Sequence, residues 1–338
     1  MDFKISIIIP VYNLENYIER TLDSVCSQMT RDVELLIIND GSVDNSLEKI
    51  NNYLESKNID GVSVFTGENQ GLVAARNKGI SKSKGEYLFF LDGDDVVFEG
   101  TISSVLEILN SKSPDALIGK YQKINTEGRI LYNYDDKYIT PKPEDITSNF
   151  ILEQCLLKNI VMVIGTVFYS RKVIDSIELI FGDKNFKGAY GEEIEFYFRF
   201  LTNSTSITFL DVNILGYTAR DNSLISTIDK PIEVLQNYIT RMMSLKNELS
   251  GKVPNNTLRL FDSTFLPGLI LSLSIYSYYN EVKVPRDIIN RLKYVSIKDT
   301  ILKKKRRGLG LYFGSLALYL SPVFFVTLLK ILKIKNRF

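Results

Sequence analysis

The chain has 338 residues, of which 45% are hydrophobic, and this length and composition favour a globular protein of roughly two structural units. Its formal net charge of +1 excludes a general nucleic-acid-binding protein. It contains no histidine, which excludes Ser-His-Asp triads, Cys-His pairs and histidine-ligated zinc, so any acid–base chemistry must use carboxylates, lysine or tyrosine.

The cysteines and the amino terminus indicate a cytoplasmic protein. Cys26 and Cys155 provide neither a disulfide framework nor a zinc site, which fits a reducing compartment. Residues 1–4 lead directly into a short apolar segment that is too brief for a signal peptide. We therefore expect the protein to begin in the cytosol.

Four short apolar runs alternate with helical patterns in the first hundred residues. The runs at 5–9, 33–38, 61–65 and 86–91 predict buried strands, and Asn13 is expected to cap the helix that follows the first strand. The alternation predicts a parallel sheet with helices on both faces, whose strands have their carboxyl ends at one edge. Ligands bind at that edge in such sheets.

The strand predicted at 86–91 is followed at once by three carboxylates, Asp92, Asp94 and Asp95. Carboxylates this close repel one another unless a cation or a set of hydrogen-bond donors compensates them. A bend at Gly93 can turn Asp92 and Asp94 toward one hard cation such as Mg²⁺ or Mn²⁺. The alternative is an acidic turn in which Asp94 or Asp95 caps the next helix.

Polar residues also follow the first two predicted strands. Tyr12 and Asn13 follow the first strand, and Asp40 and Ser42 follow the second. Turn chemistry alone explains each of them. Because the carboxyl ends of the strands converge, these residues and the three carboxylates together predict a single site.

Four ordered motifs carry a resemblance to a known family. SIIIPVYN at 6–13, IINDGSVDNS at 37–46, ENQGLVAARNKGI at 68–80 and GEYLFFLDGDD at 85–95 resemble the successive motifs of the inverting family 2 glycosyltransferases. The resemblance covers roughly residues 4–226. It implies the GT-A fold, an α/β fold with a Rossmann-like, mainly parallel mixed sheet flanked by helices.

The resemblance also implies roles for individual residues. Tyr12 would stack on the nucleotide base, Asp40 would accept a hydrogen bond from the uracil ring, and Arg76 would lie near the nucleotide. Asp92 would face the ribose or a metal ion, and Asp94 would ligate the divalent cation, Mn²⁺ or Mg²⁺, that joins both phosphates of a UDP-sugar. Asp95 would either hold the loop or touch the acceptor. The predicted donor site also includes Pro10, Asn13, Gly93 and Arg220.

The second half of the predicted catalytic region contains both helix and strand patterns. A helix is predicted at 101–109, and a hairpin is predicted from strands at 116–124 and 129–134. Residues 135–148 are polar and contain proline, which predicts a loop near the acceptor. The apolar segment 160–169 predicts a further strand. Acceptor specificity is expected to reside in the loops at 135–148 and 183–191.

The pair Glu192-Glu193 is the second candidate constellation. In the family resembled here, a Glu-Asp pair opens a helix at this place, and its second acid removes the proton from the acceptor hydroxyl. Glu193 occupies the position of that base, although its extra methylene moves the carboxylate by about an ångström. The alternative is a helix-terminal acid that interacts with the helix dipole, the role expected of Glu192 and Glu195.

Residues 216–226 resemble the segment that closes over the diphosphate in related enzymes. Arg220 stands where an arginine or histidine is common in the family, and a guanidinium there can pair with phosphate through two hydrogen bonds. The alternative is a solvated loop charge.

From residue 229 onward helical periodicity dominates. Five basic residues at 303–307 precede a segment without charge at 308–329, and further basic residues follow it. Basic flanks on both sides favour attachment of residues 301–338 to the inner leaflet of the cytoplasmic membrane. The alternatives are a membrane span and a segment buried in a homodimer or against another partner.

These observations predict a metal-dependent inverting glycosyltransferase that transfers sugar from a UDP-sugar to a saccharide or lipid-linked saccharide in cell-surface polysaccharide synthesis. Its catalytic domain is expected at 1–228, with a nucleotide-binding half at 1–100 and an acceptor half at 101–228, followed by the helical region 229–338. Two rival hypotheses are a nucleotidyltransferase that makes nucleotide sugars and a nucleotide-sugar-binding module that has lost catalysis.

Overall fold

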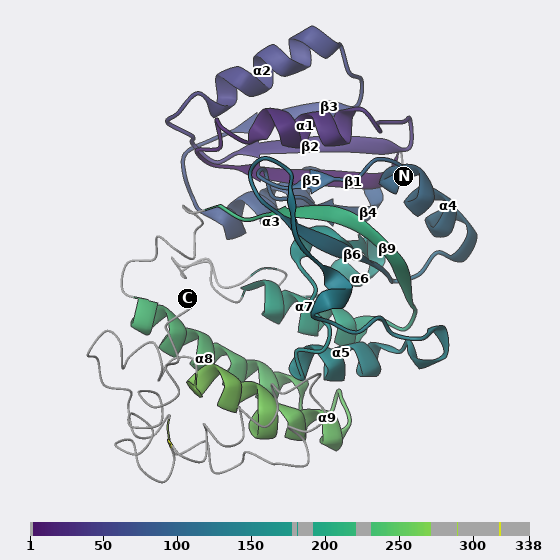
Figure 1. Cartoon of the computed structure of the whole chain (residues 1–338), viewed down its shortest axis with the longest axis vertical. Coiled ribbons are helices and arrows are strands. Elements are labelled where there is room, and N and C mark those ends of the chain that lie inside the picture. Colours follow the sequence, from purple (N-terminus) through teal and green to yellow (C-terminus); the bar gives the residue numbers. More distant parts are fainter. Residues whose placement is uncertain are drawn as a thin grey trace. The chain divides into compact units, whose positions relative to one another are not determined.

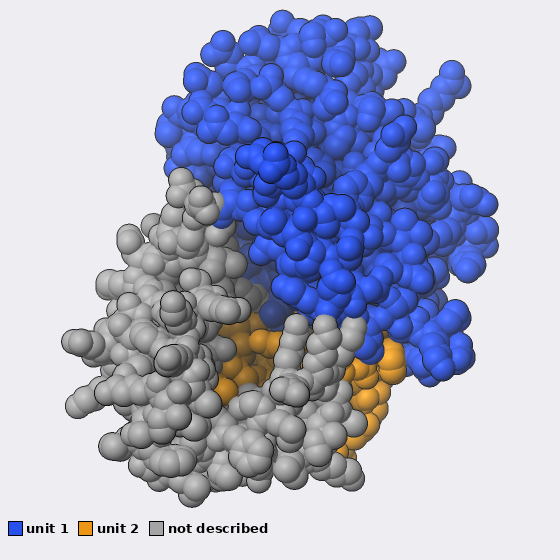
Figure 2. Space-filling view, viewed as in Figure 1, with its two compact units in different colours: residues 1–148, 162–221 blue, residues 149–161, 222–338 orange. Residues whose placement is uncertain are grey.

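The computed structural model describes residues 3–177, 181, 192–220, 231–271, 289 and 318, with the side chains of 231–236 excepted. The chain forms two compact units, shown in different colours in Figure 2. The first unit comprises Met1–Ser148 with Met162–Asp221, and the second comprises Asn149–Val161 with Asn222–Phe338. The domain boundary predicted after residue 228 falls outside the described residues.

A mixed sheet forms the centre of the first unit (Figure 1). Among the described residues it has nine strands in the order β3-β2-β1-β4-β8-β6-β9-β5, with β7 paired to β6. The strands are β1 (Phe3–Val11), β2 (Val33–Asn39), β3 (Val62–Thr66), β4 (Gly85–Phe90), β5 (Val96–Val97), β6 (Ala116–Ile124), β7 (Ile130–Asn133), β8 (Val167–Ser170) and β9 (Ile207–Thr218). The pairs β1–β2, β1–β4 and β2–β3 are parallel, which confirms the predicted parallel sheet.

Helices connect these strands. They are α1 (Ile18–Cys26), α2 (Ser46–Lys57), α3 (Leu72–Lys82), α4 (Thr101–Lys112), α6 (Arg171–Ile174) and α7 (Glu192–Asn203). Short 3₁₀ turns occur at Tyr134–Asp136, Pro143–Asp145 and Ile164–Thr166. The predicted hairpin of β6 and β7 is confirmed by their antiparallel pairing.

The two faces of the sheet carry different helices because successive side chains of a strand point in opposite directions. One face forms a core cluster with α1, α2 and α4, represented by Ile7 of β1, Leu22 of α1 and Val105 of α4. On the other face α3 lies directly on β1, where a Cβ atom on Gly79 would overlap Cγ2 of Ile8. The missing side chain at Gly79 therefore lets α3 approach the sheet closely.

Two sequence predictions need correction. Helix α1 begins at Ile18, so Asn13 does not cap it. The strand predicted at 160–169 is present only as β8, because Ile164–Thr166 forms a 3₁₀ turn. The sequence analysis also missed β9, although its run of β-branched and aromatic residues is typical of a strand.

The second unit is helical in its described residues. It contains α5 (Ser148–Leu156) from its second residue onward, α8 (Pro231–Leu249), α9 (Asn255–Leu260) and a π-helical turn at Phe261–Phe265. Thr257 Oγ1 of α9 contacts Asn149 and Glu153 of α5, each at 2.7 Å. Lys246 of α8 pairs with Asp262 of the π-helical turn at 2.5 Å.

The described helices include none with the length and apolar character needed to cross a membrane. The predicted membrane-associating segment 301–338 lies outside the described residues, apart from Leu318.

The close approach of α3 to β1 generates a stability prediction. Gly79→Val places a branched side chain against the fully buried Ile8, and overpacking of this kind costs about 1–3 kcal/mol. We expect urea denaturation to show a lower unfolding midpoint for this variant. Gly67→Val is the matched control, since Gly67 is exposed and its Cβ would meet only the flexible end of Lys78 at 3.3 Å. Equal midpoints for the two variants would contradict the packing argument.

Candidate active site

The turn that follows β4 carries the three predicted carboxylates, and α1 holds its backbone. Thr21 Oγ1 donates to the carbonyl oxygens of Gly93 at 3.0 Å and Asp95 at 2.7 Å. Arg20 Nη2 donates to the carbonyl oxygen of Asp94 at 3.0 Å. These bonds satisfy backbone acceptors of the turn, so its conformation is set by α1.

Gly93 of this turn and Pro10 of β1, both predicted in the donor site, lie beside each other. A Cβ atom on Gly93 would be 2.7 Å from Cδ1 of Leu14 and 3.3 Å from the carbonyl oxygen of Pro10. Pro10 is itself buried in β1. A side chain at position 93 would overlap Leu14, so glycine is needed here for close packing.

Each of the first two carboxylates has an arginine partner. Asp92 Oδ1 accepts a hydrogen bond from Arg76 Nη2 at 2.8 Å. Asp94 Oδ2 lies 2.5 Å from Arg220 Nε, and the Arg220 guanidinium also lies over the ring of Tyr17, 5.4 Å from its centroid. The structure thus brings Arg76, Arg220 and both carboxylates to one place, as the sequence analysis expected.

Asp95 has a different environment. Its side chain is buried, and its Oδ1 accepts a hydrogen bond from the backbone N–H of Thr218 at 2.8 Å. Burial, followed by the charges of Asp94 and Asp92, holds the pKa of Asp95 well above its usual range. The hydrogen bond of Asp95 therefore connects the turn after β4 with the end of β9.

Burial is also the main influence on the Asp94 carboxyl. Together with the neighbouring charge of Asp92 it raises the pKa of Asp94 to about 6, although Arg220 opposes the shift. Burial and the charge of Asp92 thus disfavour the ionised form of Asp94 more than Arg220 favours it.

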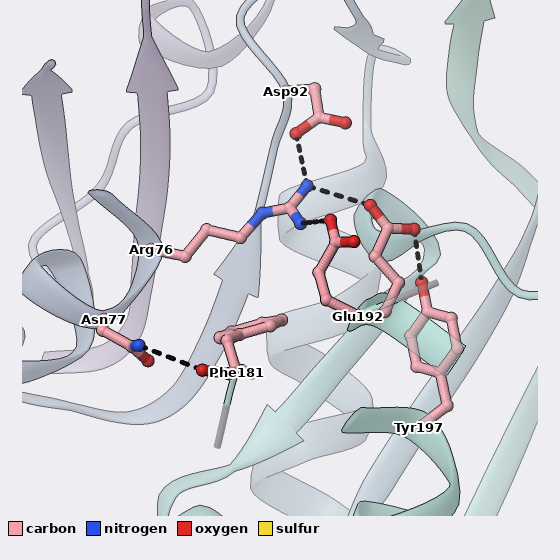
Figure 3. Close-up of polar contacts among 7 residues, drawn as sticks. Arg76, Asn77, Asp92, Phe181, Glu192 and Tyr197 are labelled. Atoms are coloured by element: carbon pink, nitrogen blue, oxygen red, sulfur yellow. Dashed lines mark hydrogen bonds and ion pairs between the residues drawn. The ribbon is translucent and has the colours of Figure 1, made fainter. Parts of the chain in front are cut away.

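Arg76 forms the centre of a cluster of carboxylates (Figure 3). Its side chain is 0% exposed, and its Nη2 lies 2.8 Å from Asp92 Oδ1 and 3.0 Å from Glu193 Oε1. Its Nη1 lies 3.6 Å from Glu192 Oε1. One guanidinium on α3 thus connects the turn after β4 with the first turn of α7.

Glu193 lies in the first turn of α7, as predicted, with 30% of its side chain exposed. Tyr197, one helical turn later, donates through its hydroxyl to Glu193 Oε2 at 3.4 Å. Burial raises the pKa of Glu193 to about 7, with Arg76 opposing this shift and Asp92 and Glu192 adding to it. A carboxylate with a pKa this close to neutrality suits a general base.

The residues predicted to surround the nucleotide base lie on neighbouring loops. Tyr12 is 46% exposed and follows β1. The carboxylate of Asp40 accepts hydrogen bonds from the backbone N–H groups of Gln70 at 2.9 Å and Gly71 at 2.7 Å. Asp40 therefore fixes the loop that leads into α3.

Asn13 connects the loops after β1 and β2. Its φ angle is 53°, its Oδ1 accepts from the N–H of Val43 at 2.9 Å, and its own N–H donates to Ser42 Oγ at 3.1 Å. These contacts replace the helix-capping role predicted for it. They position Tyr12, which precedes it, at the carboxyl edge of the sheet.

The sequence analysis missed several residues that hold the site. They are Tyr17, Arg20 and Thr21 near the start of α1, Tyr197 on α7 and Thr218 at the end of β9. Tyr17, Arg20 and Thr21 closely follow the motif at 6–13, and this nearness in the sequence is only a weak indication that they belong to the site. No sequence pattern indicated that Thr218 contacts Asp95, because more than one hundred residues separate the two.

The residues present fit a divalent cation only in part. The described part of the chain contains no group of three or more His, Cys, Asp or Glu side chains that could hold a metal ion. Asp92 and Asp94 each use one oxygen for an arginine, which leaves Oδ2 of Asp92 and Oδ1 of Asp94 as hard oxygen ligands. A cation there would need further oxygen ligands from a substrate or from water.

Comparison with protein families identifies the chain. The profile described as "Glycosyl transferase family 2" matches residues 6–177, which is just over half of the chain. The chain belongs to glycosyl transferase family 2. The family expected from the four motifs is thereby confirmed.

Several curated relatives of this family 2 chain come from bacteria. Glycosyltransferase GlyA of Streptococcus pneumoniae serotype 4 is 23% identical over 300 residues, which cover 86% of this chain and 42% of GlyA. Glycosyltransferase GlyG of the same organism is 28% identical over 239 residues, covering 66% of this chain and 73% of GlyG. Chondroitin synthase of Pasteurella multocida is 36% identical over 130 residues, covering 38% of this chain and 13% of the synthase. The chain thus spans less than half the length of GlyA.

A solved structure shares the fold of this family 2 chain. The structure of residues 1–349 of S. aureus TarS in complex with UDP-GlcNAc aligns with a TM-score of 0.69 at 18% sequence identity, covering 99% of this chain and 94% of that one. The likeness confirms the predicted α/β GT-A fold, in which a mixed sheet is flanked by helices.

Proposed function

We propose that this chain transfers a sugar from a UDP-sugar to a hydroxyl of a saccharide or lipid-linked saccharide during synthesis of a cell-surface polysaccharide, with inversion at the anomeric carbon. The observation that carries the proposal is the ion-pair cluster of Arg76, in which Asp92 of the donor-side turn and Glu193 of α7 bind the same nitrogen. The groups proposed to bind the donor and to accept the proton would therefore be neighbours at the edge of the sheet where ligands bind.

Glu193 is the proposed general base. Its carboxylate is partly exposed, it is held on one side by Arg76 and on the other by Tyr197, and its pKa of about 7 lies near the usual working pH. The acceptor hydroxyl would give its proton to Glu193 as its oxygen attacks the anomeric carbon from the face opposite the leaving UDP. The proton moves to Glu193, and the bond between sugar and diphosphate breaks.

The proposed donor site lies on the loops after β1, β2 and β4. Tyr12 offers an exposed ring for stacking on the nucleotide base, and Asp40, which is buried with 8% exposure, is proposed to offer a carboxylate oxygen to the uracil N–H. Asp92 and Asp94 would hold Mn²⁺ or Mg²⁺. The cation would neutralise charge on the departing diphosphate. Arg220, which follows β9, is proposed as a phosphate ligand.

The relatives support a nucleotide-sugar donor and a saccharide acceptor. The TarS structure contains UDP-GlcNAc, and the curated relatives include a chondroitin synthase and a hyaluronan synthase of Pasteurella multocida. These are properties of those proteins, and they favour a UDP-sugar and a growing saccharide as substrates of this chain.

Two substitutions test the assigned roles. Glu193→Gln removes the proposed base, and we expect acceptor-dependent turnover to fall by about 100-fold or more while UDP binding is retained. Asp94→Asn removes a cation ligand, and we expect both turnover and Mn²⁺-dependent UDP binding to fall. The measurement is UDP release from a panel of UDP-sugars with Mn²⁺, with and without saccharide acceptors, together with calorimetric titration of UDP.

Glu107→Gln is the control for these variants, because Glu107 is an exposed residue of α4 outside the site. Acceptor-dependent transfer by Glu193→Gln at the wild-type rate would show that the base lies elsewhere. Binding of UDP by the wild type without turnover on any donor and acceptor pair would support a nucleotide-sugar-binding module instead.

We also propose peripheral attachment of the chain to the cytoplasmic face of the membrane, where a lipid-linked acceptor would be presented. The support is the sequence of 301–338, in which the basic run at 303–307 precedes the uncharged segment 308–329. Basic residues next to an anionic leaflet contribute about 1 kcal/mol each to membrane binding.

Changing the five basic residues at 303–307 to glutamine tests this attachment. We expect a large loss of co-sedimentation with vesicles that contain anionic phospholipid. Vesicles of neutral phosphatidylcholine are the control, and they should bind both forms equally weakly. Undiminished binding of the variant to anionic vesicles would rule out this electrostatic contribution.

A further inference from the structure

Arg76 is enclosed by the protein on every side. Its side chain has 0% exposure, and it extends from α3 toward carboxylates on two other segments (Figure 3). A nucleotide could contact this guanidinium only if the residues around it moved. The location near the nucleotide implied by the family resemblance therefore does not make Arg76 a nucleotide ligand in this structure.

We propose that Arg76 is a positioning residue that orients the carboxylate of Glu193 relative to Asp92 in the turn after β4, and that it does not bind the nucleotide. This inference rests on the proposed function, because it concerns the base of that reaction. Arg76 acts through Glu193 and Asp92 and touches neither substrate.

A single nitrogen of Arg76 holds two carboxylates. Arg76 Nη2 lies 2.8 Å from Asp92 Oδ1 and 3.0 Å from Glu193 Oε1, so its two hydrogens can serve one carboxylate each. Asp92 belongs to the turn after β4, and Glu193 belongs to α7. Their separation is therefore set by one planar, rigid group.

Aromatic packing keeps the guanidinium in place. The ring centroid of Phe181 lies 5.5 Å from the Arg76 guanidinium carbon, and Asn77 Nδ2, next to Arg76 on α3, donates to the carbonyl oxygen of Phe181 at 3.3 Å. Phe181 in turn packs on Phe90 of β4 and Phe196 of α7, with ring centroids 5.2 Å and 4.4 Å away. These rings help to bury Arg76, whose side chain is 0% exposed, whereas the carboxylates of Asp92 and Glu193 stay partly exposed.

The charges in the cluster do not balance. One guanidinium meets Asp92, Glu192 and Glu193, so negative charge is in excess. Burial acts to lower the pKa of Arg76, but these three carboxylates outweigh it and hold the pKa above its usual range. Arg76 is therefore a permanent cation whose removal would raise the pKa of Glu193 further.

Other titratable groups face Glu193 and are retained in every variant below. Tyr197 of the same helix bonds to it, and Tyr169 of β8 and Tyr217 of β9 interact with it electrostatically, as does the buried Asp95. The pKa values of all three tyrosines are raised by burial, so their hydroxyls stay neutral in the working range. The pKa values of Asp94 and Asp95 are also raised, but both residues are present in every variant, so a difference between variants in the acid limb of the pH profile reports the changed residue.

The experiment compares Arg76→Met, Arg76→Lys and Glu192→Gln with the wild type. It measures kcat for sugar transfer, the pH profile of kcat/KM and the calorimetric Kd of UDP with Mn²⁺. For Arg76→Met we expect kcat to fall by about 100-fold, because the base loses both its orientation and its ionised form, with the Kd of UDP changed by less than about threefold.

The pH profiles give a readout that a purely structural role would not move. Loss of the adjacent cation in Arg76→Met should move the acid limb to higher pH by about 1–3 units. Arg76→Lys keeps the charge without the two-armed geometry, so its acid limb should stay near that of wild type while kcat falls less steeply. Glu192→Gln removes a neighbouring negative charge and should move the acid limb to lower pH.

Two outcomes overturn the inference. One is an increase of tenfold or more in the Kd of UDP for Arg76→Met or Arg76→Lys, which would identify a nucleotide ligand. The other is a kcat that stays at the wild-type value in Arg76→Lys, which keeps the charge but loses the two-armed geometry and so decides the question even if Arg76→Met fails to fold. Either result, with Glu193→Gln inactive, defeats only this inference, whereas full transfer by Glu193→Gln defeats the proposed base itself.

Discussion

The buried ion pair between Arg76 and the carboxylates around it is the interaction on which the candidate site depends. Arg76 reaches these carboxylates because Gly79, one helical turn later on α3, lets that helix lie directly on β1. The guanidinium then connects a turn at the carboxyl end of β4 with the beginning of α7. Through the Arg76 guanidinium, the close packing of α3 on β1 thus fixes the position of Asp92 relative to Glu193.

Gathering carboxylates at a buried sheet edge is costly, and the chain compensates the cost in three ways. Arginines neutralise Asp92 and Asp94, a backbone N–H binds Asp95, and the backbone of the turn is held by hydrogen bonds from α1. Burial, together with the neighbouring carboxylates, nevertheless raises the pKa values of Asp94 and Glu193. The site is therefore suited to receive positive charge and to accept a proton.

Local sequence predicted the parts of the fold that depend on local patterns. Continuous apolar runs predicted the parallel strands, and the acids at Glu192 and Glu193 correctly indicated the start of a helix. The strand at 160–169 was wrong because an apolar run does not distinguish a buried strand from a buried turn. The bonds of Asn13 to Val43 and of Asp95 to Thr218 depend on folding partners that no local pattern specifies.

The central claim is that Glu193 deprotonates an acceptor hydroxyl for a single in-line displacement. The most direct test is the anomeric configuration of the product, determined by proton NMR on material made from a UDP-α-sugar. A single displacement assisted by a base predicts a β-linked product. An α-linked product would contradict the account, because retention requires a different mechanism in which Glu193 would not have the assigned role.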